Sequence, residues 1–139
     1  MTKDELIQFI KTTNIGFLAT VAADGAPRVR PVGIHTVYGD DLFFFTFAST
    51  RKVEELKANP EVEVVWARND TLSQVRIKGK ASIVDDQATC DRFKADEPIV
   101  SRLLPPGAES LFCLFRVSPQ RVEVAEGLVP YQQVAWTQT

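Results

Sequence analysis

Two basic residues, Arg51 and Lys52, stand in the first turn of a predicted helix. The helix is predicted over residues 50–59, because Val53 and Leu56 recur at helical spacing and a proline follows. The first turn of a helix holds unpaired N–H groups and the positive end of the macrodipole, so each cation there costs about 0.3–1 kcal/mol. A bound anion would offset this cost, since the N–H groups and both side chains would point toward it.

Hydroxyl groups gather at the same point of the chain. Thr46, Ser49 and Thr50 supply hydroxyl donors, with a hydroxyl cap expected at the start of the helix. The arginine can hold two phosphate oxygens at once, while the lysine acts as a point charge. These residue types suit a phosphate group. The alternative is that both cations turn into solvent and pair with Glu54 and Glu55.

Length and composition favour a single globular domain over residues 1–139. The chain is 45% apolar and 24% charged, which is ordinary for a soluble domain with its own core. A net charge of −2 and a pI near 5.4 argue against broad binding of nucleic acid or anionic membranes. Any basic site must therefore be local.

Cysteine and histidine are too few to predict a metal site. Cys90 and Cys113 have no CxxC spacing, and His35 is the only histidine. Residues 1–11 are charged and amphipathic, unlike a signal peptide, and the apolar runs are too short to cross a bilayer. We therefore expect a cytoplasmic protein whose two thiols are reduced and structural.

Hydrophobic periodicity and turn residues predict three helices and six strands. One helix lies within residues 1–14 and starts with a Thr–Glu capping box, and the others cover residues 50–59 and 86–94. The six predicted strands cover residues 15–22, 28–38, 42–47, 62–68, 73–84 and 111–126. The second strand contains Pro31 and Gly33, so it should be an edge or bulged strand.

These strands and their short turns favour a small antiparallel barrel, because closure removes the exposed edges of long apolar strands. Trp66 shares a strand face with two valines and is expected in the core or at a dimer interface. The C-terminal tail, residues 128–139, begins as an apolar but irregular stretch. We expect the tail at the interface of a homodimer.

Three stretches, in a fixed order, resemble a known family. The run FFTFASTRKVEELKANPEVEVVW is similar to the phosphate-binding segment of the pyridoxamine 5′-phosphate oxidase-like, FMN-binding split-barrel superfamily. The stretches PRVRPVGI and SQVRIKGKA resemble two strands of that family that meet the flavin. The resemblance covers roughly residues 6–124 and is closest to the short, general-stress-protein type. It implies a mainly β, six-stranded antiparallel split barrel with a few short flanking helices, binding FMN between two subunits.

The resemblance also implies which residues hold the cofactor. The residues implied at the ribityl chain and the phosphate are Phe45, Thr46, Ser49, Thr50, Arg51 and Lys52. The residues whose backbone groups would face the isoalloxazine edge are Arg30, Pro31, Val32 and Gly33. Gln74 would reach the flavin from the adjacent subunit. Judged by its strand alone, Gln74 is one more solvated side chain on a polar face.

Trp136 and His35 can each be interpreted in two ways. Trp136 either stacks near the flavin of a partner chain or plugs one end of the barrel as a packing aromatic. His35, two residues beyond Gly33, is a candidate proton relay near neutral pH in a flavin site. Its alternative is an ordinary strand histidine with one hydrogen bond.

The chain departs from the vitamin enzyme of this family at its C-terminus, where PYQQVAWTQT replaces an Arg-x-His substrate motif. Oxidation of pyridoxamine phosphate is therefore not expected. We expect an FMN-dependent oxidoreductase, related to stress response, that passes hydride or electrons between NAD(P)H and a small acceptor. The alternatives are a non-catalytic flavin store or sensor, or a relative that binds deazaflavin F420 or haem. Haem would need an axial ligand, for which His35 is the one histidine.

Overall fold

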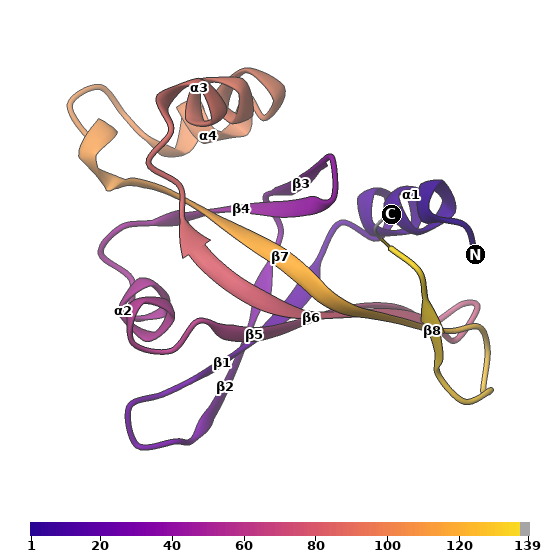
Figure 1. The fold of residues 1–139 in the computed structure, drawn as a ribbon. Helices are drawn as coiled ribbons and strands as arrows, with labels where there is room; N and C mark the ends of the chain where they lie inside the picture. The colour runs from indigo at the N-terminus through magenta and orange to yellow at the C-terminus, as the bar shows by residue number, and fades with distance from the viewer. Residues whose placement is uncertain (137–139) are drawn as a thin grey trace.

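The computed structural model describes residues 1–136, which form one curled antiparallel sheet with helices at its margins (Figure 1). The strands are β1 (Gly16–Val21), β2 (Pro27–Val32), β3 (His35–Tyr38), β4 (Asp41–Phe47), β5 (Glu61–Arg68), β6 (Ser73–Ile83), β7 (Phe112–Ala125) and β8 (Gln132–Val134). Their order across the sheet is β2-β1-β5-β6-β7-β4-β3, and β8 pairs with the later half of β7.

The two edge strands show why the sheet must curl. β2 and β3 lie at opposite ends of the strand order, about 29 Å apart if the sheet were flat. Only Gly33 and Ile34 separate them in the sequence, and this connection spans at most about 11 Å. The edges must therefore approach each other, and the amide of Phe45 on β4 donates to the carbonyl of Ile34 at 3.0 Å. The predicted mainly β, antiparallel split barrel is confirmed.

The predicted count of six strands was too low, because residues 1–136 contain eight. The predicted strand over residues 28–38 divides into β2 and β3, since the chain turns at Gly33 to pass from one edge of the sheet to the other. Part of the tail predicted to be irregular also forms β8, which pairs Gln132 with Val124 and Val134 with Val122. The last part of that tail, residues 137–139, lies outside the described residues.

Four α-helices and a short 3-10 helix accompany the sheet within the described residues. They are α1 (Lys3–Thr13), α2 (Arg51–Ala58), α3 (Gln87–Asp96), α4 (Ile99–Leu103) and η1 (Glu109–Leu111). The predicted capping box at the start of α1 is confirmed, whereas α4 was not predicted. In Figure 1, α2 lies at one end of the sheet, α1 near the other, and α3 and α4 together above β4. No helix within residues 1–136 is long and apolar enough to cross a membrane.

The barrel interior is filled by aromatic and branched side chains. Trp66 is fully buried, and its ring stacks with that of Phe44, which in turn stacks on Phe115. Full burial of each such side chain contributes roughly 1.5–3 kcal/mol. Trp66 is therefore a core residue of its own subunit. Gly16 lies so close to this ring that an added Cβ would stand 2.7 Å from the indole Nε1.

Candidate functional site

The start of α2 differs in one detail from the sequence prediction. Thr50 occupies the N-cap position with extended backbone, but its side chain makes no cap hydrogen bond. Its Oγ1 instead donates to the carbonyl of Phe47 at 2.9 Å and lies 3.4 Å from the Oγ1 of Thr46. The predicted hydroxyl cap is therefore wrong. The side chain of Thr50 therefore accepts no hydrogen bond from the unpaired N–H groups of the first turn.

Arg51 and Lys52 have no acidic partner in the described part of the chain. No carboxylate lies within 4.0 Å of either side chain, so the predicted alternative of pairing with Glu54 and Glu55 is wrong. Arg51 is exposed and Lys52 is partly buried. Burial, and after it the charge of Arg30, lowers the pKa of Lys52. An anion bound here would oppose both influences on the pKa of Lys52 by supplying a negative partner.

Glu55, one turn further along α2, uses its carboxylate to bind residues of β1 and β2. Its Oε2 accepts hydrogen bonds from Thr20 Oγ1 at 2.5 Å and from Arg30 Nη2 at 2.8 Å. Arg30 Nη1 donates to the same threonine oxygen at 2.7 Å, and Arg28 Nε lies 3.8 Å from Glu55 Oε1. This network ties α2 to β1 and β2. The hydrogen bond from Thr20 lowers the pKa of Glu55, outweighing burial, which raises it, and Arg30 adds to the lowering.

The residues predicted at the phosphate, the ribityl chain and the ring come from neighbouring elements. Arg30 reaches α2 through Glu55, and Phe45 on β4 is bonded to the residue after Gly33. Phe45 and Thr46 are buried, while Gly33 is exposed at the end of β2. The start of α2, the end of β4 and the end of β2 therefore frame one region of the surface.

Within one chain, Gln74 and Trp136 lie away from the region between α2, β4 and β2. Gln74 lies on β6, and its Oε1 accepts a hydrogen bond from the hydroxyl of Tyr131. Trp136 is 5% exposed, and its Nε1 donates to the carbonyl of Asp40 at 2.7 Å. The ring belongs to the barrel core, which is the plug position, with the Nζ of Lys3 5.0 Å from its centroid. The contact of Gln74 with a flavin of the adjacent subunit stays a prediction.

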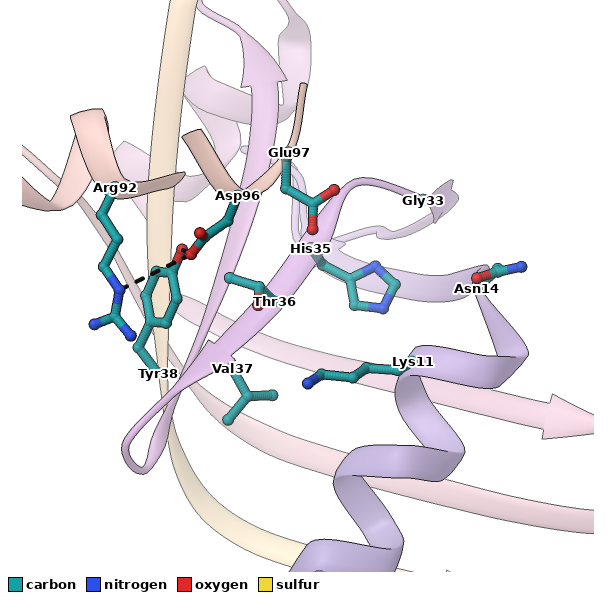
Figure 2. A pocket seen from close by; sticks show the side chains of 10 residues that line it. All are labelled: Lys11, Asn14, Gly33, His35, Thr36, Val37, Tyr38, Arg92, Asp96 and Glu97. Atoms are coloured by element: carbon teal, nitrogen blue, oxygen red, sulfur yellow. Dashed lines mark hydrogen bonds and ion pairs between the residues drawn. The ribbon is translucent and has the colours of Figure 1, made fainter. Parts of the chain in front are cut away.

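A cavity of about 600 Å³ opens beside the end of β2, between α1, β3 and α3. Figure 2 shows Glu97, at the end of α3, pointing toward His35, while Lys11 of α1 runs past the imidazole below it and Gly33 and Asn14 lie at one side. Gly33 and His35 are the predicted site residues that line this space. Its volume is that of a small-molecule site.

His35 is held by the core behind this cavity. Its Nε2 accepts a hydrogen bond from Trp66 Nε1 at 3.2 Å, and its Nδ1 is buried without a partner in the described residues. Burial lowers the pKa of His35, so the neutral form is favoured. An imidazole whose Nε2 is occupied by an indole donor suits packing at the cavity wall better than proton relay.

The sequence did not predict three residues that form a network with Arg30 beneath the site: Thr20, Arg28 and Glu55. The signal was present for one of them. Thr20 shares the buried face of its strand with Leu18, where a polar side chain must find a hydrogen-bond partner. No local pattern distinguished Glu55, which is buried, from its exposed neighbour Glu54.

Comparisons with known sequences agree on one family. Residues 2–124 match the family model described as pyridoxamine 5′-phosphate oxidase. A protein of Cupriavidus metallidurans named pyridoxine/pyridoxamine 5′-phosphate oxidase is 36% identical over 101 residues, covering 72% of this chain and 47% of the relative. The chain spans about half the length of the curated relatives it matches.

Solved structures share the fold at lower identity. A Clostridium acetobutylicum protein related to general stress protein 26 has a TM-score of 0.81 at 16% identity, covering 95% of this chain and 92% of that one. A heme binding protein from Mycobacterium smegmatis has a TM-score of 0.75 at 18% identity, covering 96% of this chain and 58% of that one. Identities this low show the fold alone.

Proposed function

Because the chain belongs to the pyridoxamine 5′-phosphate oxidase family, we propose that it is an FMN-binding flavoprotein that passes hydride or electrons between NAD(P)H and a small acceptor. The observation that carries this proposal is the pair of cations at the start of α2. Arg51 and Lys52 have no carboxylate partner within residues 1–136, and the phosphate of FMN would supply one.

The donors present fit a phosphate monoester. Lys52 is partly buried beside the positive charge of Arg30, so a dianion would stabilise its charged form. Arg51, with the N–H groups of the first turn, offers further donors to the same oxygens, and Ser49 adds an exposed hydroxyl. The bound phosphate would offset the cost of two cations at a helix N-terminus.

The chain's own residues would bind and orient rather than transfer protons. FMN, when bound, supplies the hydride and electron chemistry. The strand end from Arg30 to Gly33 would align the ring edge, and the cavity beside Gly33 leaves room for a small acceptor. His35 would form the wall of that room, since Trp66 occupies its Nε2.

An apolar face supports the proposed homodimer. Phe17 on β1 and Val29 on β2 are 45% and 67% exposed, and with Val65 on β5 they line a shallow groove. The charged residues of this groove, Glu63 and Arg76, form an ion pair with each other. A second copy of the chain would remove this surface from water. In the dimer the flavin would lie between subunits, where Gln74 of the adjacent subunit would reach it.

Haem is the second candidate, because a heme binding protein shares the fold. A histidine axial ligand could only be His35, the one histidine of the sequence, whose Nε2 is bonded to a buried indole. FMN therefore fits the described side chains better. Deazaflavin also carries phosphate and would use the same cations. A flavin store or sensor would need no acceptor site.

A titration with FMN, followed by quenching of its fluorescence, tests the proposal. Riboflavin, which has the same ring without the phosphate, is the matched control and should bind far more weakly. The absorbance of the protein as purified separates flavin, deazaflavin and haem. Anaerobic mixing of the FMN complex with NADH or NADPH should bleach the flavin faster than free FMN. Absence of FMN binding would overturn the proposal, and flavin that stays oxidised would favour the store or sensor.

A further inference from the structure

One carboxylate is buried among several cations beneath the proposed phosphate site. Glu55 is 6% exposed, and its Oε1 has no hydrogen-bond partner among the described residues. Arg30 donates to its Oε2, and Arg28 lies at ion-pair distance from its Oε1. A buried carboxylate requires such partners, since desolvation otherwise disfavours its charge.

The charges in this region do not balance. Arg28, Arg30, Arg51 and Lys52 bring four positive charges, while Glu55 brings the one carboxylate that lies within 4.0 Å of any of them in the described chain. Arg30 lowers the pKa of Lys52, so the two cations repel each other in the absence of an anion. Glu55 forms an ion pair with Arg30 at 2.8 Å, so its carboxylate is the group that offsets the charge of Arg30.

We propose that Glu55 is the resident counter-anion of the phosphate site. Its carboxylate holds Arg30 and Arg28, leaves the phosphate to Arg51 and Lys52, and weakens anion binding by its own negative charge. Glu55 stands four positions after Arg51, about 6 Å of helix rise, so its field reaches a phosphate docked at the first turn. Glu55 is thus a residue that sets affinity without touching the ligand. The inference rests on the proposed phosphate site.

The direction of the effect distinguishes this role from a purely structural one. Glu55→Gln keeps an oxygen that accepts the hydrogen bonds from Thr20 and Arg30 but removes the charge. The empty protein should then melt at a lower temperature, because the repulsion between cations is no longer offset. FMN should bind about tenfold more tightly, and inorganic phosphate should raise the melting temperature more than it does in the unaltered protein. If Glu55 only held the structure together, replacing it would weaken FMN binding.

Glu54→Gln is the matched control, since it makes the same change on the same helix at an exposed position. It should change FMN affinity by less than about twofold at 0.15 M salt, where solvent screens exposed charges. Isothermal titration with FMN and with inorganic phosphate measures both variants against the unaltered protein.

Arg28→Gln tests the same charge balance if Glu55→Gln does not fold, because Arg28 is exposed and its Nε lies 3.8 Å from Glu55 Oε1. With one cation fewer beside it, the negative charge of Glu55 is less compensated, so FMN and inorganic phosphate should bind about threefold more weakly at low salt. Unchanged affinity for both ligands in this variant would overturn the proposal.

The outcomes separate the two claims. If the unaltered protein binds FMN and Glu55→Gln binds it equally or more weakly, the role of Glu55 is wrong and the phosphate site stands. If neither protein binds FMN or phosphate, the phosphate site is wrong and the role of Glu55 falls with it.

Discussion

The indole Nε1 of Trp66 donates a hydrogen bond to the Nε2 of His35 at 3.2 Å. Because an indole N–H can only donate, the Nε2 must carry no proton, and His35 is the neutral tautomer with its proton on Nδ1. The bond links the barrel core to the wall of the cavity. His35, fixed by this bond to a buried core residue, therefore has a structural role in the cavity wall.

This bond predicts a pH dependence of stability. Burial lowers the pKa of His35 below the ordinary 6.5, so the unfolded chain binds more protons than the folded chain just below pH 6.5. The stabilisation is present above pH 6.5 and is lost as the pH falls toward the folded pKa. The free energy of unfolding should therefore fall between pH 7.5 and 5.5, by at most about 1.4 kcal/mol per pH unit from this residue.

Urea unfolding at a series of pH values measures this fall. His35→Gln should flatten it, because glutamine can accept from the indole but does not titrate. Glu97, whose pKa burial raises, acts in the opposite direction in both proteins, so the difference between them isolates His35. Equal slopes in the two proteins would show that His35 does not contribute.

The approach of Gly16 to the same indole predicts a second effect. A Cβ at residue 16 would stand 2.7 Å from Trp66 Nε1 and 2.8 Å from its Cε2, and a fully buried ring has no room to move. Gly16→Ala should lower the free energy of unfolding by about 1–3 kcal/mol through overpacking. Gly33→Ala is the control, because a Cβ there meets nothing within 4 Å. Equal melting temperatures for the two variants would contradict this packing.

Periodicity predicted the core well, because burial follows from the alternation of side chains along each strand. Val64, Trp66 and Ile77 are buried as their strands required. The division of residues 28–38 into two strands was not visible locally, since it depends on which edges the sheet brings together. Prolines and glycines marked an irregular position, but only the topology shows that Gly33 crosses between the edges.

The site was less predictable than the core. The cations at residues 51 and 52 stood out because they oppose the helix dipole, a local rule. The pairing of Glu55 with Arg30 was hidden, because it joins a helix to an edge strand 25 residues earlier in the chain. The two alternatives for Trp136 could be separated only by its hydrogen bond to Asp40, 96 residues away.

The apolar face on β1, β2 and β5 predicts self-association. Val29→Glu would bury a charge in the proposed interface and should convert the dimer to monomers. Sedimentation equilibrium at micromolar concentration measures the change. Ile99→Glu is the control, since Ile99 is also exposed but lies on α4. A monomeric unaltered protein, or a Val29→Glu variant that remains dimeric, would contradict this interface.

The affinity for FMN of the double variant Arg51→Glu, Lys52→Glu tests the phosphate site most directly. Two charge reversals should remove at least two charge-assisted hydrogen bonds, worth about 1.5–3 kcal/mol each, and weaken FMN binding by more than about a hundredfold. Riboflavin binding should hardly change, and the melting temperature of the empty protein should not fall, because acidic residues are favourable at a helix N-terminus. The control reverses two exposed lysines elsewhere, Lys57→Glu and Lys78→Glu, and should retain FMN. Unaltered FMN affinity in the first variant would contradict the account.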